Sequence, residues 1–241
     1  MDLSPAVILV SPQLGENIGA AARNMLNFGI TDLRIVNPRD GWPNPQADYM
    51  AKGAISVVEN ATIYTSLKDA AKDINKIYAA TARPRDMVKP IYTPNKTARE
   101  AVKYYNMGKK SAFMFGPERS GLENDDIAIA DAISIIPVSE IYKSLNLAQA
   151  VNVFCYEWFV NLNSDAEDES EKLNANPAKK TDVINMFEHL EEELDKAGFF
   201  KVDHMKSKMI NNIRNIFIRS NLSDQDVRTL RGIIKSLTNK Q

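Results

Sequence analysis

Short hydrophobic runs alternate with longer helix-compatible segments over the first two thirds of the chain. The first run, AVILV at residues 6–10, is followed by a helical pattern at 17–28. That pattern stops before Gly29, where the C-terminal glycine of a helix belongs. The next hydrophobic run, LRIVNP at 33–38, follows at once. The pattern therefore predicts a strand, a helix and a second strand.

The same alternation continues to residue 160. It predicts further strands at 61–64, 76–82, 111–115 and 132–138, and helices at 47–54, 66–73, 97–106 and 146–160. Strands separated by helices form mainly parallel sheets with helices on both faces. The sequence thus predicts the α/β class, in which ligands bind in the loops after the carboxyl ends of the strands.

Hydrophobic content falls between Asn161 and Lys180, where Ser, Asp, Glu, Asn and Pro predominate as in a linker. Beyond it, three segments have helical spacing, with caps predicted at Thr181-Asp182 and at Ser223. So small a helical unit has little core of its own, and we expect it to pack against something larger. We divide the chain into a domain at 1–163, an acidic and polar linker at 164–180 and a helical extension at 181–241.

The net charge of −1 hides an uneven distribution of charge along the 241 residues. Residues 164–198 carry a net charge of −7, whereas residues 199–241 carry +6. A basic helical segment suits a polyanion such as nucleic acid, but a solvated charged face would give the same pattern.

Composition argues against several classes of protein. The single cysteine, Cys155, has large apolar neighbours and reads as a core thiol, and the two histidines, His189 and His204, cannot build a zinc site. The N-terminal segment resembles neither a secretory signal nor a membrane span, so we expect a cytoplasmic protein without membrane attachment or metal. Neither glycine-rich nucleotide fingerprint occurs, which argues against a nicotinamide or ATP enzyme.

Two loops after predicted strands carry candidate chemistry. In PQLGENIGAAAR, Asn17 is either a plain helix cap or a site residue, and Arg23 interrupts a face of small residues, unless it is simply a surface arginine. In FGPERSGL, Gly116 allows close approach of the backbone. Glu118 then projects from a rigid turn, unless it forms a structural ion pair with Arg119.

Two further loops have polar residues at predicted strand ends. In IPVSEIYKSLNLAQAV, Ser144 and Asn146 stand at a helix start, where a capping role and ligand binding are compatible. Arg83 and Arg85 follow the strand at 76–82, and paired guanidinium groups there would suit phosphate.

In order and spacing, NIGAAARNM, FGPERSGL and IPVSEIYKSLNLAQAV resemble the three motifs of SPOUT-superfamily RNA 2′-O-ribose methyltransferases of the TrmH and TrmJ type. The segments VNP, AKGA at 51–54, TAR at 81–83 and the C-terminal HLEEEL, GFF and LRGII resemble the TrmJ subgroup, which methylates tRNA nucleotide 32. The resemblance implies a trefoil knot in the C-terminal part of the sheet domain, a homodimer, a tRNA substrate and S-adenosylmethionine as methyl donor.

The resemblance also implies roles for individual residues. Catalytic roles would fall to Arg23, Glu118, Ser144 and Asn146, with Asn17 in support. Contacts to the donor would come from Ala80, Thr81, Ala82, Gly116, Ile136, Lys143, Ser144 and Leu145, of which Lys143 departs from the small residue common in the family. RNA contacts would come from Arg23, Arg83, Arg85 and the basic tail.

The role of Arg23 has two readings. An arginine with a pKa above roughly 12 is a poor proton acceptor, so we favour an orienting role on the phosphate and ribose over direct base catalysis. Two rivals to the whole assignment are a ribose methyltransferase acting on rRNA or another tRNA position, and a catalytically idle RNA-binding protein of the same fold.

Overall fold

The computed structural model describes residues 3–82, 88–163 and 177–238. Within them, one sheet has the strand order β3-β2-β1-β6-β4-β7-β5, and all its neighbouring strands are parallel. This confirms the predicted α/β class. The strands are β1 (Ala6–Val10), β2 (Leu33–Val36), β3 (Thr62–Tyr64), β4 (Lys76–Ala80), β5 (Ile91–Tyr92), β6 (Ser111–Phe115) and β7 (Ala132–Ser134).

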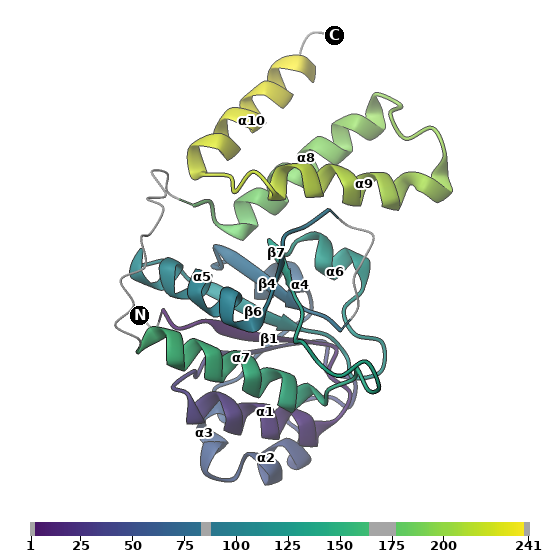
Figure 1. Cartoon of the computed structure of the whole chain (residues 1–241). Coiled ribbons are helices and arrows are strands. Elements are labelled where there is room, and N and C mark those ends of the chain that lie inside the picture. Colours follow the sequence, from purple (N-terminus) through teal and green to yellow (C-terminus); the bar gives the residue numbers. More distant parts are fainter. Residues whose placement is uncertain (1–2, 83–87, 164–176, 239–241) are drawn as a thin grey trace.

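Helices cover both faces of the sheet (Figure 1). In β1, Val7 and Leu9 belong to the core under one helical layer, whereas Ala6 and Ile8 belong to the core on the other face. A strand buried on both sides needs a continuous hydrophobic run, which AVILV supplies. The first layer contains α1 (Gly15–Asn27), α2 (Pro45–Ala51), α3 (Ile55–Glu59), α5 (Pro94–Asn106) and α7 (Leu147–Leu162); the second contains α4 (Leu67–Ala70) and α6 (Asn124–Ala128).

The elements differ from the sequence prediction in several places, and the helix α3 was not predicted. The last predicted strand stops at Ser134 instead of 138, because its neighbours also end at this register, β4 at Ala80 and β5 at Tyr92. The short strand β5 and the helix α6 were not predicted. Both are too short to show a period, and α6 depends on a capping box between Glu123 and Asp126.

The C-terminal part forms α8 (Lys180–Lys196), α9 (Asp203–Ile218) and α10 (Asp224–Thr238). Their shared core consists of Ala178, Val183, Met186, Phe187, Ile218, Val227 and Ile234. Ser223 caps α10 as predicted, since its hydroxyl accepts the Asp226 N–H at 3.1 Å. The predicted cap by Thr181 is wrong, because α8 already begins at Lys180 and the Thr181 hydroxyl donates to the Lys72 carbonyl at 2.6 Å.

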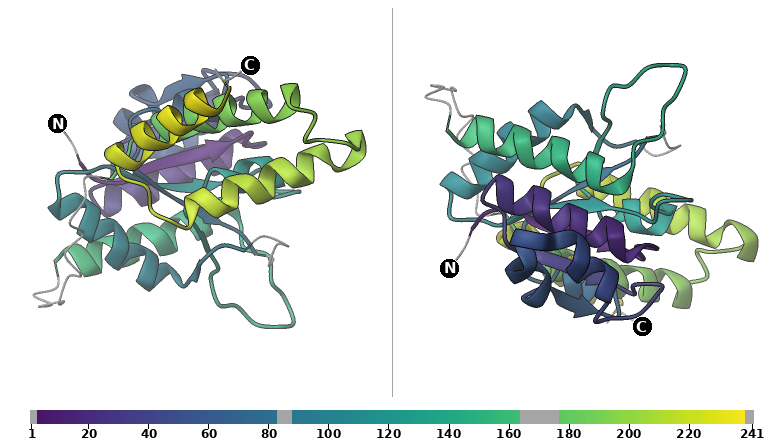
Figure 2. Two further views of the ribbon diagram at one scale, coloured as in Figure 1. Left: turned by 90° about the horizontal axis from the view of Figure 1, so that it is seen from above. Right: turned by 90° about the horizontal axis from the view of Figure 1, so that it is seen from below.

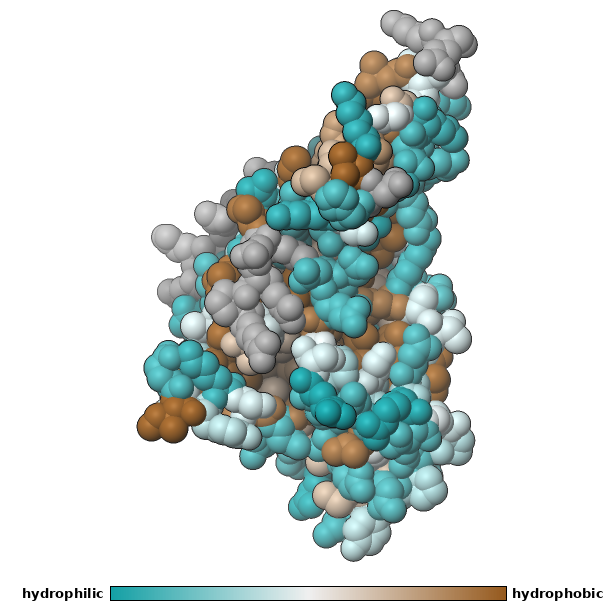
Figure 3. Space-filling view, turned by 90° about the vertical axis from the view of Figure 1, so that its right-hand side faces the viewer, coloured by the Kyte–Doolittle hydropathy of each residue, from teal (hydrophilic) through white to brown (hydrophobic). Residues whose placement is uncertain are grey.

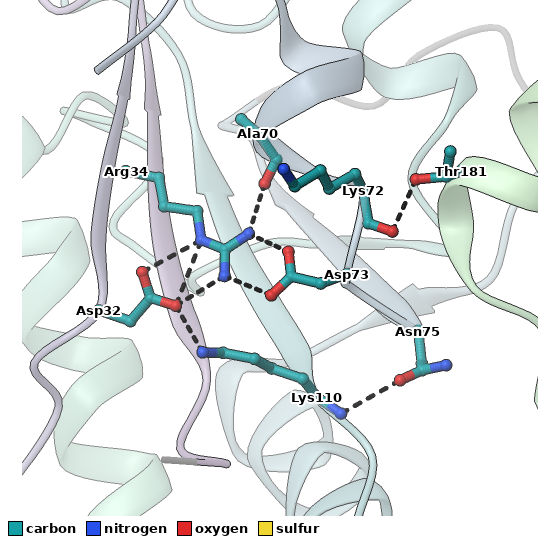
Figure 4. A network of polar contacts seen from close by, with 8 residues as sticks. All are labelled: Asp32, Arg34, Ala70, Lys72, Asp73, Asn75, Lys110 and Thr181. Atoms are coloured by element: carbon teal, nitrogen blue, oxygen red, sulfur yellow. Dashed lines mark hydrogen bonds and ion pairs between the residues drawn. The ribbon is translucent and has the colours of Figure 1, made fainter. Parts of the chain in front are cut away.

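Ion pairs cluster at the amino ends of the strands, next to the hydrogen bond from Thr181 at the start of α8 to the Lys72 carbonyl (Figure 4). Arg34, almost fully buried, pairs with Asp32 at 2.7 Å and with Asp73 at 2.5 Å. Beside this network, the buried Lys180 ammonium pairs with Asp131 at 2.8 Å. The helical extension thus packs on the larger domain as expected, with Ile184 reaching the core of the second face.

Candidate active site

One cavity of about 370 Å³ lies where β4, β6 and β7 end. These strands are neighbours in the sheet, so the loops that follow them meet at the carboxyl edge. Its volume falls in the range of small-molecule sites, about 300–1,000 Å³. The lining residues are Ala80, Thr81, Ala82, Phe115, Gly116, Pro117, Glu118, Arg119, Ser120, Gly121, Ser134, Ile136, Val138, Lys143, Ser144, Leu145, Leu147 and Ala150.

Two glycines shape the loop that forms one wall. A Cβ on Gly116 would lie 2.2 Å from the Leu122 nitrogen and 2.4 Å from the Gly121 carbonyl carbon, so no side chain fits there. Gly121 has φ +68°, a conformation in which glycine carries no steric penalty. The loop therefore folds back on itself against the end of β6.

A chain of polar contacts connects the three loops that carry the sequence motifs. The Glu118 carboxylate accepts the Gln13 N–H at 2.8 Å, the Leu14 N–H at 3.2 Å and the Asn17 amide at 2.7 Å. The Asn17 side-chain oxygen in turn accepts the Asn146 amide at 2.7 Å. The carboxylate lies at the N-terminus of α1, where negative charge is favoured.

This chain decides two of the alternatives left open by the sequence. Asn17 is inside α1 and is not its N-cap, which is Leu14. Among the described residues Glu118 makes no ion pair with Arg119, since backbone and amide groups take up its carboxylate. Asn146 caps α7 by accepting the Ala148 N–H at 2.8 Å, whereas Ser144 is exposed on the cavity wall.

The predicted site residues fall into three groups. All the predicted donor-contact residues line the cavity, together with Glu118, and Asn17 and Asn146 adjoin it through the polar chain. Arg23 is exposed on α1 and is not among the lining residues. Its guanidinium has no hydrogen bond or ion pair within 3–82, 88–163 and 177–238. Arg83 and Arg85 lie outside the described residues.

Ser134 and Val138 are among the lining residues that the sequence prediction did not assign. Ser134 is fully buried, lines the cavity and shares a hydrogen bond of 2.8 Å with the Thr97 hydroxyl. A serine inside the otherwise hydrophobic run AISII was the available signal. Val138 also lines the cavity, and no pattern in the sequence marks it.

Other possible chemistries find little support among the residues that the structure describes. Cys155 is fully buried, and burial raises the pKa of its thiol, as suits a core residue. The same residues contain no group of His, Cys, Asp and Glu side chains that could hold a metal ion. No described helix is both long and apolar enough to cross a membrane.

A parallel sheet with a small-molecule cavity at the carboxyl ends of its strands, walled by three interlinked loops, is typical of ligand-binding α/β proteins. Residues 4–156 match the SpoU rRNA Methylase family, and the chain belongs to it; the protein is a methyltransferase. Residues 181–241 match the C-terminal domain of the tRNA methyltransferase TrmJ.

Relatives are similar over nearly the whole chain. The tRNA (cytidine/uridine-2′-O-)-methyltransferase TrmJ of Citrobacter koseri is 33% identical, over 96% of this chain and 95% of its own. The crystal structure of TrmJ from Z. mobilis ZM4 is 41% identical, with a TM-score of 0.87 over 97% of this chain and 98% of that one. The SpoU methyltransferase AviRb from Streptomyces viridochromogenes shares the fold alone, at 17% identity and a TM-score of 0.52 over 67% of this chain and 61% of that one.

Proposed function

We propose that the protein transfers a methyl group from S-adenosylmethionine to the ribose 2′-hydroxyl of nucleotide 32 in the anticodon loop of tRNA. The observation that carries this proposal is the cavity, which gathers every residue assigned to the donor from the motifs. The match of residues 181–241 to the TrmJ C-terminal domain favours tRNA over rRNA. Nucleotide 32 comes from the resemblance to the TrmJ subgroup.

The cavity suits the donor in chemistry as well as in size. Its walls combine apolar groups such as Ile136 and Leu145 with the loop backbone around Gly116, and such surroundings hold a ligand by packing and main-chain hydrogen bonds. Ala80, Thr81 and Ala82 form the wall after β4, and Lys143 and Ser144 the wall before α7. When bound, the donor would supply an electrophilic methyl group on a sulfonium. The sulfur would leave as a neutral thioether that needs no acid, and the proton of the 2′-hydroxyl would pass to water.

The residues of the polar chain act by position. Glu118 ties the α1 start to the cavity wall, and Asn146 ties α7 to the same point through Asn17. A site that must align an oxygen with a methyl carbon gains from such rigidity. Ser144 is exposed beside the cavity, within reach of an incoming ribose.

Arg23 enters the reaction through a second copy of the chain in this proposal. It is exposed outside the cavity, beside an exposed apolar surface of α1 and α7 formed by Leu26, Tyr156, Phe159 and Val160. A homodimer that buries this surface is consistent with the patch, since isolated exposed apolar groups are common but clusters mark interfaces. Arg23 would then orient the phosphate and ribose. The trefoil knot remains part of the proposal.

RNA would be held by the arginines near the site and by the basic tail. Arg83 and Arg85 follow β4, whose loop lines the cavity, and residues 199–241 carry a net charge of +6. Phosphate contacts of this kind make affinity fall steeply with salt.

The test is incubation of the purified protein with labelled S-adenosylmethionine and unmodified tRNA transcripts, followed by mass mapping of 2′-O-methyl nucleosides. Methylation at nucleotide 32 supports the whole proposal. Methylation elsewhere in tRNA keeps the reaction and removes the position, and transfer only to rRNA replaces the substrate. Absence of donor binding would instead favour the idle RNA-binding protein.

The Arg23→Ala variant tests the reaction in more detail. We expect turnover to be lost while donor affinity, measured by calorimetry, largely survives, because Arg23 lies outside the cavity. Loss of donor binding would reject both the orienting and the base role.

A further inference from the structure

The tip of the α8–α9 hairpin combines exposed hydrophobic and basic side chains. Phe199, Val202 and Met205 are 47%, 41% and 45% exposed, although each is large and apolar. Lys201 and Lys208 are exposed between and beyond them. Neither ammonium has a hydrogen bond or ion pair to any residue that the structure describes. The tip therefore offers apolar area together with two exposed ammonium groups.

The fold holds this tip firmly in place. Gly198 ends α8 with φ +71°, and the Phe199 N–H returns to the Leu194 carbonyl at 2.9 Å. Phe200 is buried and meets the Phe199 ring edge-on, with centroids 5.4 Å apart. The half-exposed Phe199 ring is thus presented by a packed neighbour and a fixed turn, so little entropy is lost when it binds a partner.

The tip also lies at the same end of the molecule as the cavity. The α8 start is fastened at the amino edge of the sheet by Lys180 and Asp131, and α8 then runs toward the carboxyl edge (Figures 1 and 2). On α9, Asn211 donates to Asp125 at 3.2 Å, in the helix directly after the cavity wall. Seen from the carboxyl end, hydrophobic and hydrophilic side chains are mixed over the helical extension above that edge (Figure 3).

We propose that this tip, residues 199–208, binds an unpaired segment of the RNA substrate, with Phe199 stacking on a base and Lys201 and Lys208 contacting phosphates. The inference rests on the proposed function, since it assumes an RNA substrate. Aromatic rings interleaved with cations are the groups that proteins use on single-stranded nucleic acid, because every base offers a π-face and every nucleotide a negative charge. The net charge of +6 on residues 199–241 favours the negatively charged RNA over an apolar partner that has few acidic groups.

The first experiment measures tRNA binding by Phe199→Ala, with Phe199→Tyr as the conservative variant and Tyr49→Ala as a control for an exposed aromatic on α2. We expect roughly tenfold weaker binding for Phe199→Ala, since stacking contributes about 1–3 kcal/mol per base. Phe199→Tyr and Tyr49→Ala should bind like the wild type. Wild-type affinity in Phe199→Ala would overturn the stacking site, and a changed oligomeric state would assign the tip to a protein contact instead.

The second experiment compares the salt dependence of tRNA binding in Lys201→Ala/Lys208→Ala and in the charge-matched Arg231→Ala/Lys235→Ala on α10. Loss of two contacts to a single strand should lower the slope of log K against log salt by about 1.4 in the first variant alone. Equal losses in both variants would mean diffuse attraction by the tail and no tip site.

Wild-type methylation of the same transcripts separates the two proposals. Transfer by the wild type with unaltered binding by the tip variants rejects the tip only. Binding that depends on the tip, without any methyl transfer by the wild type, rejects the proposed reaction only.

Discussion

The charged side chains at the amino ends of the strands (the amino edge) are arranged differently from those at the carboxyl ends (the carboxyl edge). At the amino edge, Arg34 and Lys180 are buried and paired with carboxylates at 2.5–2.8 Å. At the carboxyl edge, Arg119 lines the cavity, is exposed and has no ion-pair partner among the described residues. Burial makes pairing necessary at the amino ends of the strands, whereas the cations at the cavity are exposed to solvent: Arg119 is unpaired within the described ranges and Lys143 forms an exposed ion pair with Glu140 at 2.5 Å.

The largest effect should follow from breaking the amino edge. Asp131→Ala removes the partner of the buried Lys180 ammonium, the acceptor of the Ile77 N–H at 2.7 Å and the nearest anion to Lys76 at 3.9 Å. Removing one member of a buried pair leaves an uncompensated charge, which costs about 3–5 kcal/mol. Urea unfolding at pH 7 measures this loss.

The control for this prediction is Asp40→Ala, which breaks an exposed pair with Arg39. No measurable change is expected there, because exposed pairs are screened by solvent. Equal unfolding midpoints for wild type and Asp131→Ala would show that the buried pair does not stabilise the docking of α8 on the sheet.

The buried pair of Asp131 and Lys180 also predicts how the stability of the fold depends on pH. Burial alone would raise the pKa of Asp131, but Lys180, Lys76 and the Ile77 N–H together hold that pKa below its ordinary value. A depressed carboxyl pKa contributes stability above the unfolded value of about 3.9 and loses it as pH falls through the folded value. The stability gap between wild type and Asp131→Ala should therefore be constant from pH 7 to about pH 5 and shrink below about pH 4. A gap that persists into strong acid would contradict the ion pair as its source.

The next effect concerns the polar chain at the carboxyl edge. Glu118→Gln replaces one acceptor oxygen with an amide group that opposes N–H donors from the α1 start. We expect turnover to fall about 100-fold, since a displacement of about 1 Å in an aligned site has that cost. Donor affinity should change less than about tenfold, because packing and backbone groups dominate the cavity walls.

Single-turnover methyl transfer and calorimetry separate these two quantities. Glu16→Gln serves as the control, because Glu16 is exposed in the first turn of the same helix. Its carboxylate makes no hydrogen bond or ion pair within the described ranges. A similar loss in Glu16→Gln would assign the effect to helix charge in place of the polar chain.

A smaller effect tests the shape of the cavity wall. In Gly116→Ala the new methyl group would lie 2.2 Å from a backbone nitrogen, so the loop must move. Overpacking of this kind costs about 1–3 kcal/mol, and we expect donor binding to weaken about tenfold. Gly232→Ala on α10 has open space and should stabilise the protein by about 0.5–1 kcal/mol. Gly116→Ala with unchanged donor affinity would show that the loop is not part of the donor site.

These contrasts show which features the sequence could predict. The period of hydrophobic residues predicted the parallel sheet, because strands buried on both faces must be apolar throughout, as AVILV is. The residues that the motif resemblance assigns to the donor all line one cavity. Ser223 as a cap followed from local chemistry alone.

The remaining features depend on contacts between distant segments. An ion pair of Glu118 with its neighbour Arg119 was an open alternative in the sequence, but Glu118 accepts hydrogen bonds from residues more than 100 positions away. Lys180 looked like part of a solvated linker, yet it is buried against Asp131. No local pattern distinguishes a buried charge from an exposed one, since the partner that makes burial tolerable is supplied by the fold.

The smallest effect on stability is expected for Arg119→Ala at the carboxyl edge, and Arg34→Ala at the amino edge is its counterpart. Arg34→Ala leaves the half-exposed Asp73 without its ion-pair partner and leaves Asp32 with Lys110 alone, at 2.6 Å, so it should destabilise the fold by about 3 kcal/mol at most. Arg119→Ala should change stability by less than about 0.5 kcal/mol. If Arg119 contacts phosphate, its loss lowers the salt slope of tRNA binding by about 0.7 and leaves donor affinity intact. If Arg119→Ala lost as much stability as Arg34→Ala, the contrast between the edges would be wrong, because the exposed Arg119 would then have a structural role.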